Sequence, residues 1–164
     1  RGVKRRRMAF AIRILAVGRA RQGPEGSLFE AYVRRMSWPI ALEEIDIKAK
    51  LPPARRKAAE TEKLLSLVPG GAVVVALDAG GTPLSSEGFA DRLRHWRDDG
   101  TQALCLLIGG ADGLDRAAFE RADFVLSLGS MIWPHLLVRT MLAEQLYRAQ
   151  QILSGHPYHR GSGA

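Results

Sequence analysis

Residues 123–135 read Asp-Phe-Val-Leu-Ser-Leu-Gly-Ser-Met-Ile-Trp-Pro-His, and this stretch decides the fold. Its first half, Phe124–Leu128, is an apolar run of strand length. A glycine-containing connection follows, and then a long segment, Leu136–Leu153, whose apolar residues recur at helical spacing. A strand followed by a turn and a helix indicates a βα unit, with hydrogen-bonding groups where the strand ends. This end of the chain therefore predicts a ligand site as well as a core.

The same alternation of strand and helix runs through the whole chain. The expected strands are Phe10–Val17, Ile40–Ile47, Ala72–Leu77, Leu104–Ile108 and Phe124–Leu128. The expected helices run from Pro24 to before Pro39, from Pro52 to near Val68, from Ser85 to Asp98, from Asp115 to near Ala122, and from Leu136 to Leu153. This order predicts a single-domain α/β fold, with a mostly parallel sheet and helices on both faces. The third and fourth strands are almost wholly apolar, which places them in the middle of the sheet.

The length of 164 residues fits one domain, since domains usually hold about 100–200 residues. The formal charge of +7 is concentrated at the start of the chain, where five basic residues stand in the first seven positions. The remainder holds 19 basic and 17 acidic residues and is nearly neutral. We therefore divide the chain into a basic arm (1–8), the domain (9–160) and a short tail (161–164). For the arm, three interpretations stay open: an extension upstream of Met8, a solvated tail and a phosphate-binding arm.

The single cysteine excludes a disulfide framework and a cysteine-rich zinc site. Cys105 lies inside an apolar run, which predicts a buried and unreactive thiol and a reducing compartment. No apolar run approaches the roughly 20 residues needed to cross a bilayer. Arg13 interrupts the apolar stretch after Met8, so a signal peptide is not expected. The composition favours a soluble, cytoplasmic protein.

Three glycine-containing loops follow the ends of three consecutive expected strands. They cover residues 77–83, 109–113 and 128–134, and they should converge, because open α/β sheets bind ligands outside the carboxyl ends of their strands. The loop at 109–113 lacks the Lys and Ser/Thr of a P-loop and does not have dinucleotide-binding spacing. Asp112 and Asp115 also place negative charge where a phosphate would need positive potential. A neutral or cationic adenosine ligand suits this site better than a polyphosphate.

The histidines do not form a recognisable metal site or nucleophilic triad. His135, His156 and His159 lack the spacing of a zinc motif and a nearby acidic ligand, so no metal is expected. Ser130 has no nucleophile elbow around it. On the last helix, Arg139 and Arg148 are either solvated helix residues or phosphate-binding residues. Glu144 lies within reach of both by helical spacing, so an ordinary ion pair stays open as well.

Four motifs, taken together and in order, resemble the ribosomal large subunit methyltransferase H (RlmH) family of the SPOUT superfamily. They read Leu-Leu-Ile-Gly-Gly-Ala-Asp-Gly-Leu at 106–114, Trp-Pro-His-Leu-Leu-Val-Arg at 133–139, Leu-Ala-Glu-Gln-Leu-Tyr-Arg-Ala at 142–149 and His-Pro-Tyr-His-Arg at 156–160. The resemblance extends from Ile12 to Arg160. It departs from the family at Leu136, where members often carry proline or glutamine, and residues 1–8 lie outside it.

The resemblance implies a SPOUT-like homodimer with a C-terminal trefoil knot. It implies S-adenosylmethionine as cofactor, and the ribosome and its 23S ribosomal RNA as partners. The implied reaction is methylation of N3 of a pseudouridine in the helix 69 loop of that RNA, within the assembled ribosome. The positions that the family uses for the cofactor correspond here to Leu77, Gly109, Leu128, Gly129, Ser130, Met131, Ile132 and Trp133.

The reaction also requires removal of the N3 proton, so a base or an oxyanion stabiliser is expected near the substrate. The candidate catalytic groups are His135, Arg139, Tyr158, His159 and Arg160, the last three of which could reach the partner subunit's cofactor. A tail that only docks the dimer is an equally good interpretation of the last three. Two other functions stay open: a ribosome-binding module without turnover, and a SPOUT enzyme that acts on transfer RNA.

Overall fold

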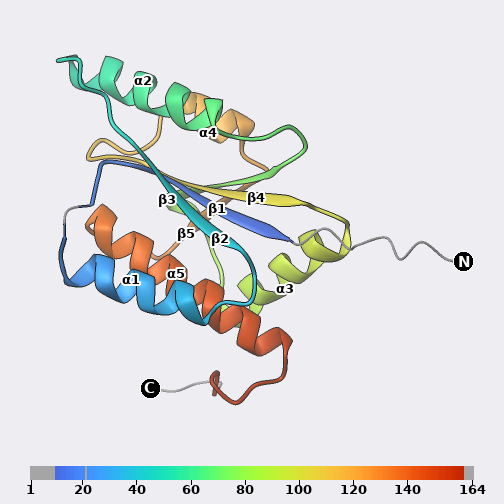
Figure 1. The fold of residues 1–164 in the computed structure, drawn as a ribbon. Coiled ribbons are helices and arrows are strands. Elements are labelled where there is room, and N and C mark those ends of the chain that lie inside the picture. Colours follow the sequence, from blue (N-terminus) through green and yellow to red (C-terminus); the bar gives the residue numbers. More distant parts are fainter. Residues whose placement is uncertain (1–9, 21, 161–164) are drawn as a thin grey trace, which may run out of the picture.

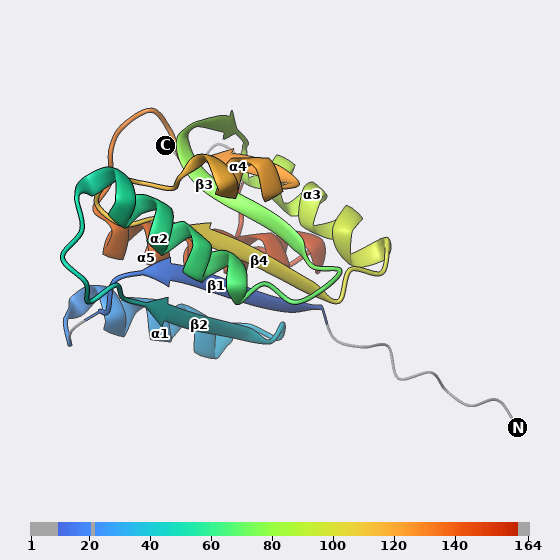
Figure 2. The same cartoon turned by 90° about the horizontal axis from the view of Figure 1, so that it is seen from above.

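A single parallel sheet of five strands forms the centre of the molecule, in a computed structural model that describes residues 10–20 and 22–160. The strands are β1 (Ala11–Val17), β2 (Ile40–Ile45), β3 (Val73–Pro83), β4 (Ala103–Ile108) and β5 (Phe124–Ser127). Their order across the sheet is β2-β1-β4-β3-β5, and Figure 2 shows β2, β1, β4 and β3 side by side from above. The basic arm at 1–8 and the tail at 161–164 lie outside the described residues.

Helices cover both faces of this sheet. They are α1 (Pro24–Arg35), α2 (Pro53–Ser66), α3 (Ser86–Asp98), α4 (Arg116–Arg121) and α5 (His135–Leu153). Figure 1 shows α2 and α4 on one face and α1, α3 and α5 on the other. Two apolar cores result, one built around Leu64 of α2 and the other around Leu142 and Leu146 of α5. The expected α/β fold, with a mostly parallel sheet and helices on both faces, is confirmed.

The most apolar strands lie inside the sheet, as their sequences predict. β4 is the central strand, and its residues Leu104–Leu107 are completely buried because helices cover both of its faces. Cys105 is one of these residues, so its thiol is buried, and burial raises its pKa. A raised pKa lowers the thiolate fraction, which makes this cysteine a packing residue.

The strand β3 continues beyond its expected end at Leu77. The segment 77–83 is predicted as a loop, but the chain leaves the register at Leu77 and rejoins it at Thr82, so that both residues pair with Leu126 of β5. Gly81 permits this return, because a Cβ there would lie 2.7 Å from the carbonyl oxygen of Val125. The prediction of a loop is therefore wrong, and the segment is an excursion of β3 that stands beside β5.

Candidate functional site

The three glycine-containing segments converge at the carboxyl ends of β3, β4 and β5, as predicted. Together with the start of α5 they form a cleft of about 170 Å³, which we call the strand-end cleft. Its lining residues are Leu77, Asp78, Ala79, Ile108, Gly109, Gly110, Gly113, Leu126, Leu128, Gly129, Met131, Ile132, Trp133, His135 and Val138. Glycine backbone and mostly apolar side chains line it, a combination that suits a flat ring held by main-chain hydrogen bonds.

Two glycines are required for the shape of this cleft. A Cβ on Gly109 would lie 2.5 Å from the carbonyl carbon of Gly113, so no other residue lets the loop close on itself. Gly129 adopts a φ of 111°, a conformation that residues with side chains rarely adopt. Its N–H donates to the Oγ of buried Ser127, which lies 3.0 Å from the carbonyl oxygen of Ala79. Ser127 thus ties the β3 excursion to the turn after β5.

Seven of the eight residues predicted to bind the cofactor line the strand-end cleft: Leu77, Gly109, Leu128, Gly129, Met131, Ile132 and Trp133. The eighth, Ser130, lies exposed in the same segment without lining the cleft. Sequence reasoning missed Asp78, although it directly follows Leu77. It also missed Ser127, whose only signal was a polar residue at the end of an apolar strand.

The segment 131–133 is unusually exposed for its apolar composition. Ile132 is 93% exposed and Met131 is 71% exposed, while Trp133 is partly covered. Several exposed apolar side chains in one short segment are typical of a surface that binds a ligand or another protein.

His135 and Arg139 both lie at the start of α5 but occupy different environments. His135 is exposed and lines the cleft, so its imidazole is accessible to a substrate. Arg139 is only 2% exposed: its Nη1 donates to Glu44 at 2.6 Å, and its Nη2 donates to the carbonyl oxygens of Val17 and Gly18. Arg139 therefore ties α5 to the carboxyl ends of β1 and β2.

Of the two arginines within helical reach of Glu144, Arg139 does not pair with it but turns toward Glu44 of β2. Burial alone would raise the pKa of Glu44. The backbone N–H of Ala20 and the hydrogen bond and charge of Arg139 outweigh burial, and they hold the pKa of this carboxyl below its ordinary value. Glu144 pairs with Arg148 at 2.6 Å, so the ion-pair interpretation is confirmed for Arg148.

The segment 156–160 folds back onto its own chain. Arg148 donates to Nδ1 of His159 at 3.1 Å, and because a guanidinium can only donate, Nδ1 must accept. The proton of His159 therefore sits on Nε2 and is donated to Glu87 at 2.7 Å. This hydrogen bond holds the pKa of Glu87 below its ordinary value. Arg160 lies exposed beyond this contact.

Tyr158 belongs to the same group of side chains. Its hydroxyl donates to Glu144 at 3.1 Å, and its ring packs edge-on against Tyr147. Burial, followed by the negative charge of Glu144, raises the pKa of Tyr158 to about 12. At neutral pH Tyr158 is consequently a hydrogen-bond donor and not a base.

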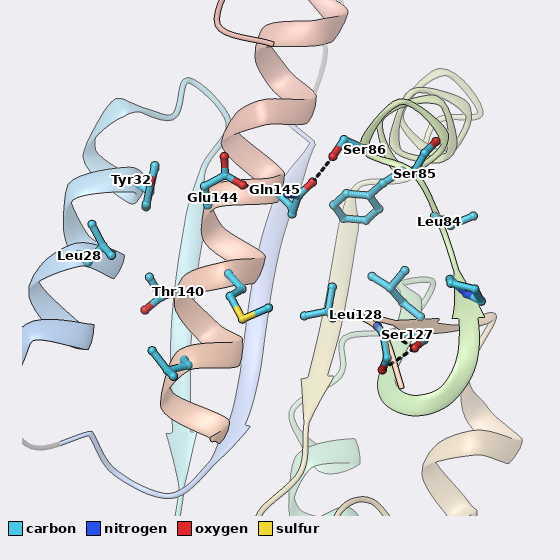
Figure 3. A pocket seen from close by; sticks show the side chains of 16 residues that line it. Leu28, Tyr32, Leu84, Ser85, Ser86, Ser127, Leu128, Thr140, Glu144 and Gln145 are labelled. Atoms are coloured by element: carbon cyan, nitrogen blue, oxygen red, sulfur yellow. Dashed lines mark hydrogen bonds between the residues drawn. The ribbon is translucent and has the colours of Figure 1, made fainter. Parts of the chain in front are cut away.

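A second and larger cavity lies between α1, α3 and α5, next to β5. This interhelical groove has a volume of about 630 Å³ and is shown in Figure 3. Leu28 and Tyr32 of α1 face Thr140 and Glu144 of α5 across it, and Ser86 donates to Gln145 at 2.7 Å. Helix side chains form most of its walls, whereas glycine backbone is concentrated in the strand-end cleft. We therefore place the candidate ligand site in the cleft, despite its smaller volume.

Among residues 10–20 and 22–160, no group of three or more His, Cys, Asp or Glu side chains could hold a metal ion. Within the same part of the chain, no helix is both long and apolar enough to cross a membrane.

Comparisons with known proteins agree with this architecture. The family model described as a predicted SPOUT methyltransferase matches residues 10–159. Ribosomal RNA large subunit methyltransferase H from Rhodospirillum centenum is 52% identical over 147 residues, which cover 90% of this chain and 97% of the relative. The protein of the same name from Paramagnetospirillum magneticum is 56% identical over 147 residues, which again cover 90% of this chain and 97% of the relative.

Solved structures show the same fold at low sequence identity. A probable methyltransferase from Bordetella pertussis has a TM-score of 0.53 at 16% identity, covering 85% of this chain and 96% of that one. A probable methylase family protein from Haemophilus influenzae has a TM-score of 0.55 at 12% identity, covering 88% and 66%. With the family match and the two close relatives, these structures lead to one conclusion: the chain belongs to the SPOUT methyltransferases and, within them, to the ribosomal RNA large subunit methyltransferase H family.

Proposed function

We propose that this protein transfers a methyl group from S-adenosylmethionine to N3 of a pseudouridine in the helix 69 loop of 23S ribosomal RNA, within the assembled cytoplasmic ribosome. The observation that carries the proposal is the similarity to ribosomal RNA large subunit methyltransferases over nine-tenths of the chain. The protein is a SPOUT methyltransferase, and its cofactor is S-adenosylmethionine. The pseudouridine and its place in the RNA come from the family resemblance.

The strand-end cleft has the features that this cofactor needs. Gly109 and Gly129 bring main-chain groups close to the ligand, while Leu77, Ile132 and Trp133 offer apolar surface to an adenine ring. Ser130, exposed in the same segment, is the remaining proposed contact. No side chain of the cleft lining is basic apart from His135, which fits a ligand that carries no phosphate.

S-adenosylmethionine supplies a methyl group that its sulfonium already activates, so the protein has to align the attacking nitrogen and exclude water. The N3 proton of the base must also be removed. His135 is the exposed imidazole at the rim of the cleft, and we assign it the role of proton acceptor. Arg139 is engaged within its own chain, so it would act by holding the start of α5 in place.

A second copy of the chain is proposed to cover the apolar surface around the start of α5. Among the described residues, the exposed large apolar side chains are Leu28, Met131, Ile132, Trp133 and Leu137. They belong to α1, to the segment before α5 and to α5 itself, and Leu28 and Leu137 also line the interhelical groove. A homodimer would bury these side chains. We also propose that the chain forms the C-terminal trefoil knot that the family resemblance implies.

Methyl transfer to three substrates tests the function. With radiolabelled S-adenosylmethionine, we expect label in intact ribosomes and little or none in naked ribosomal RNA or in transfer RNA. Label in transfer RNA alone would contradict the proposal and favour a SPOUT enzyme of that class. Binding to ribosomes without methyl transfer and without cofactor binding would identify a non-catalytic module instead.

The segment 158–160 is proposed to act in the partner's site, because it cannot reach its own. His159 is bound by Arg148, which stands 13 residues after His135 on α5. This spacing corresponds to about 20 Å along the helix. Tyr158, His159 and Arg160 therefore lie at the opposite end of α5 from the cleft of the same chain. Only a second copy could bring them near a cofactor.

Mixed dimers test this arrangement. We expect His159→Ala homodimers, which keep the cofactor cleft, and Gly109→Ala homodimers, which keep the tail, each to have little activity on ribosomes. A mixed dimer of the two variants should recover activity, since one intact cleft then meets one intact tail. If the His159→Ala homodimer is as active as wild type, the segment has no catalytic role. If it is inactive and mixing restores nothing, the segment acts within its own chain.

A further inference from the structure

Glu60 on α2 is a buried residue whose carboxylate oxygens keep some contact with solvent but have no hydrogen-bond partner among the described residues. The residue is only 5% exposed, yet within residues 10–20 and 22–160 it forms neither a hydrogen bond nor an ion pair. Burial raises its pKa. Arg56 opposes this shift, and the negative charges of Asp112 and Asp46 add to it. Buried carboxylates are normally paired, because an isolated charge loses its hydration.

The carboxylate lies directly against the glycine loop of the strand-end cleft. A Cβ on Gly110 would lie 2.6 Å from Oε2 of Glu60 and 3.0 Å from Cγ1 of Val17. Gly110 itself lines the cleft. The neighbouring Thr61 is also buried, and its hydroxyl accepts the backbone N–H of Asp115 at 2.9 Å. The middle of α2 therefore supports the loop after β4 and places a negative charge directly behind Gly110 of the cleft lining.

This charge lowers the stability of the protein at neutral pH. Because folding raises the pKa of Glu60, the unfolded chain ionises more easily, and the penalty is fully present above the folded pKa. It disappears as the pH falls below the unfolded value. Glutamine has almost the same shape and would avoid this cost. The presence of the charge is therefore better explained by its effect on a ligand than by its effect on folding.

We propose that Glu60 is a specificity-determining residue that makes the strand-end cleft favour the cationic cofactor over its neutral product. This inference rests on the proposed function. S-adenosylmethionine carries a sulfonium, an ammonium and a carboxylate, a net charge of +1. Loss of the methyl group leaves a neutral thioether, so S-adenosylhomocysteine has no net charge. Negative potential from Glu60, reinforced by Asp78 in the cleft lining and by Asp112, attracts the first ligand more than the second.

Binding of three ligands to the Glu60→Gln variant, measured by calorimetry at pH 8, tests the proposal. We expect the affinity for S-adenosylmethionine to fall roughly tenfold, as for a unit charge about 10 Å away in a protein-like dielectric. The affinity for S-adenosylhomocysteine should change by less than about twofold on the same electrostatic argument. Sinefungin, which replaces the sulfonium by a charged amine group, should follow S-adenosylmethionine. Thermal unfolding should show the variant to be at least as stable as wild type.

Two variants on the same helix serve as controls. Glu62 is exposed, and Glu62→Gln removes the same charge from α2 without facing Gly110, so it should leave the affinities for both ligands unchanged. Thr61→Val removes the hydrogen bond to the loop without changing the charge. It should therefore lower the affinities for both ligands by the same factor.

An equal loss of affinity for S-adenosylmethionine and S-adenosylhomocysteine in Glu60→Gln would overturn the inference, because Glu60 would then only support the loop. Wild-type affinities of Glu60→Gln for both ligands would overturn it as well. If wild-type protein bound none of the three ligands, the proposed function itself would fail, and this outcome is distinct from both.

Discussion

Replacing Arg139 by alanine is expected to lower the free energy of unfolding by about 3–5 kcal/mol, the usual effect of removing one member of a buried ion pair. The substitution leaves Glu44 without its guanidinium and deprives the carbonyl oxygens of Val17 and Gly18 of their donor. It also opens a cavity between α5 and the ends of β1 and β2. Urea unfolding followed by circular dichroism measures the loss.

The pH dependence of stability provides an independent measurement of the same contact. The folded pKa of Glu44 lies below its ordinary value of 4.5, so the ion pair contributes its full stabilisation above pH 4.5. This contribution is lost as the pH falls through the folded pKa. In Arg139→Ala the pKa of Glu44 should return toward or above 4.5, and this part of the acid dependence should disappear.

Arg116→Ala is the matched control, because Arg116 is 88% exposed and pairs with Glu120 only at the surface. Its effect should stay below about 1 kcal/mol. Arg139→Lys should recover part of the lost stability, since one ammonium cannot replace three guanidinium contacts. If Arg139→Ala unfolded like wild type but no longer methylated ribosomes, Arg139 would be a catalytic group and the structural interpretation would be wrong.

Replacing Gly109 by alanine is expected to abolish tight binding of S-adenosylmethionine. The added Cβ would lie 2.5 Å from the carbonyl carbon of Gly113 and 2.9 Å from the backbone nitrogen of Leu114. These atoms belong to the main chain and cannot rotate away, so the loop has to move out of the cleft wall. Overpacking of this kind costs about 1–3 kcal/mol, equivalent to roughly 5- to 150-fold in affinity when it falls on the binding loop.

Calorimetry with S-adenosylmethionine measures this loss, and Gly70→Ala provides the control. Gly70 has no neighbouring atom within 4 Å of its Cβ position, so alanine there should leave both affinity and stability unchanged. Wild-type affinity in Gly109→Ala would show that the loop after β4 does not hold the cofactor, and that the ligand site lies elsewhere.

Much of this architecture could be predicted from local sequence patterns. Five apolar runs gave five strands, and the run around Cys105 lies at the centre of the sheet because it has no polar face to expose. The convergence of the three glycine-containing segments followed from the parallel sheet alone, because successive strands then end at the same edge. Seven of the eight predicted cofactor positions consequently line one cleft.

What the sequence did not reveal were contacts between distant residues. Helical spacing offered Glu144 as a partner of both Arg139 and Arg148, and it pairs with Arg148. The partner of Arg139 is Glu44, 95 positions earlier in the chain. The continuation of β3 past Leu77 requires that both Leu77 and Thr82 pair with Leu126 of β5. No local sequence pattern predicts such a pairing. Glu60 looked like one charge among many on α2, since only the fold brings it against Gly110.

The contacts of Arg139 also determine when folding can be completed during synthesis of the chain. Arg139 lies in the last helix of the described chain and holds residues that were made 95 to 122 positions earlier. Long-range contacts of this kind form late, because the intervening chain must first be ordered. A nascent chain that lacks α5 has a sheet face covered only by α1 and α3, and an incomplete cleft. We therefore expect the protein to become competent for its ligand only after translation has passed the final helix, with no active shorter intermediate on the ribosome that makes it.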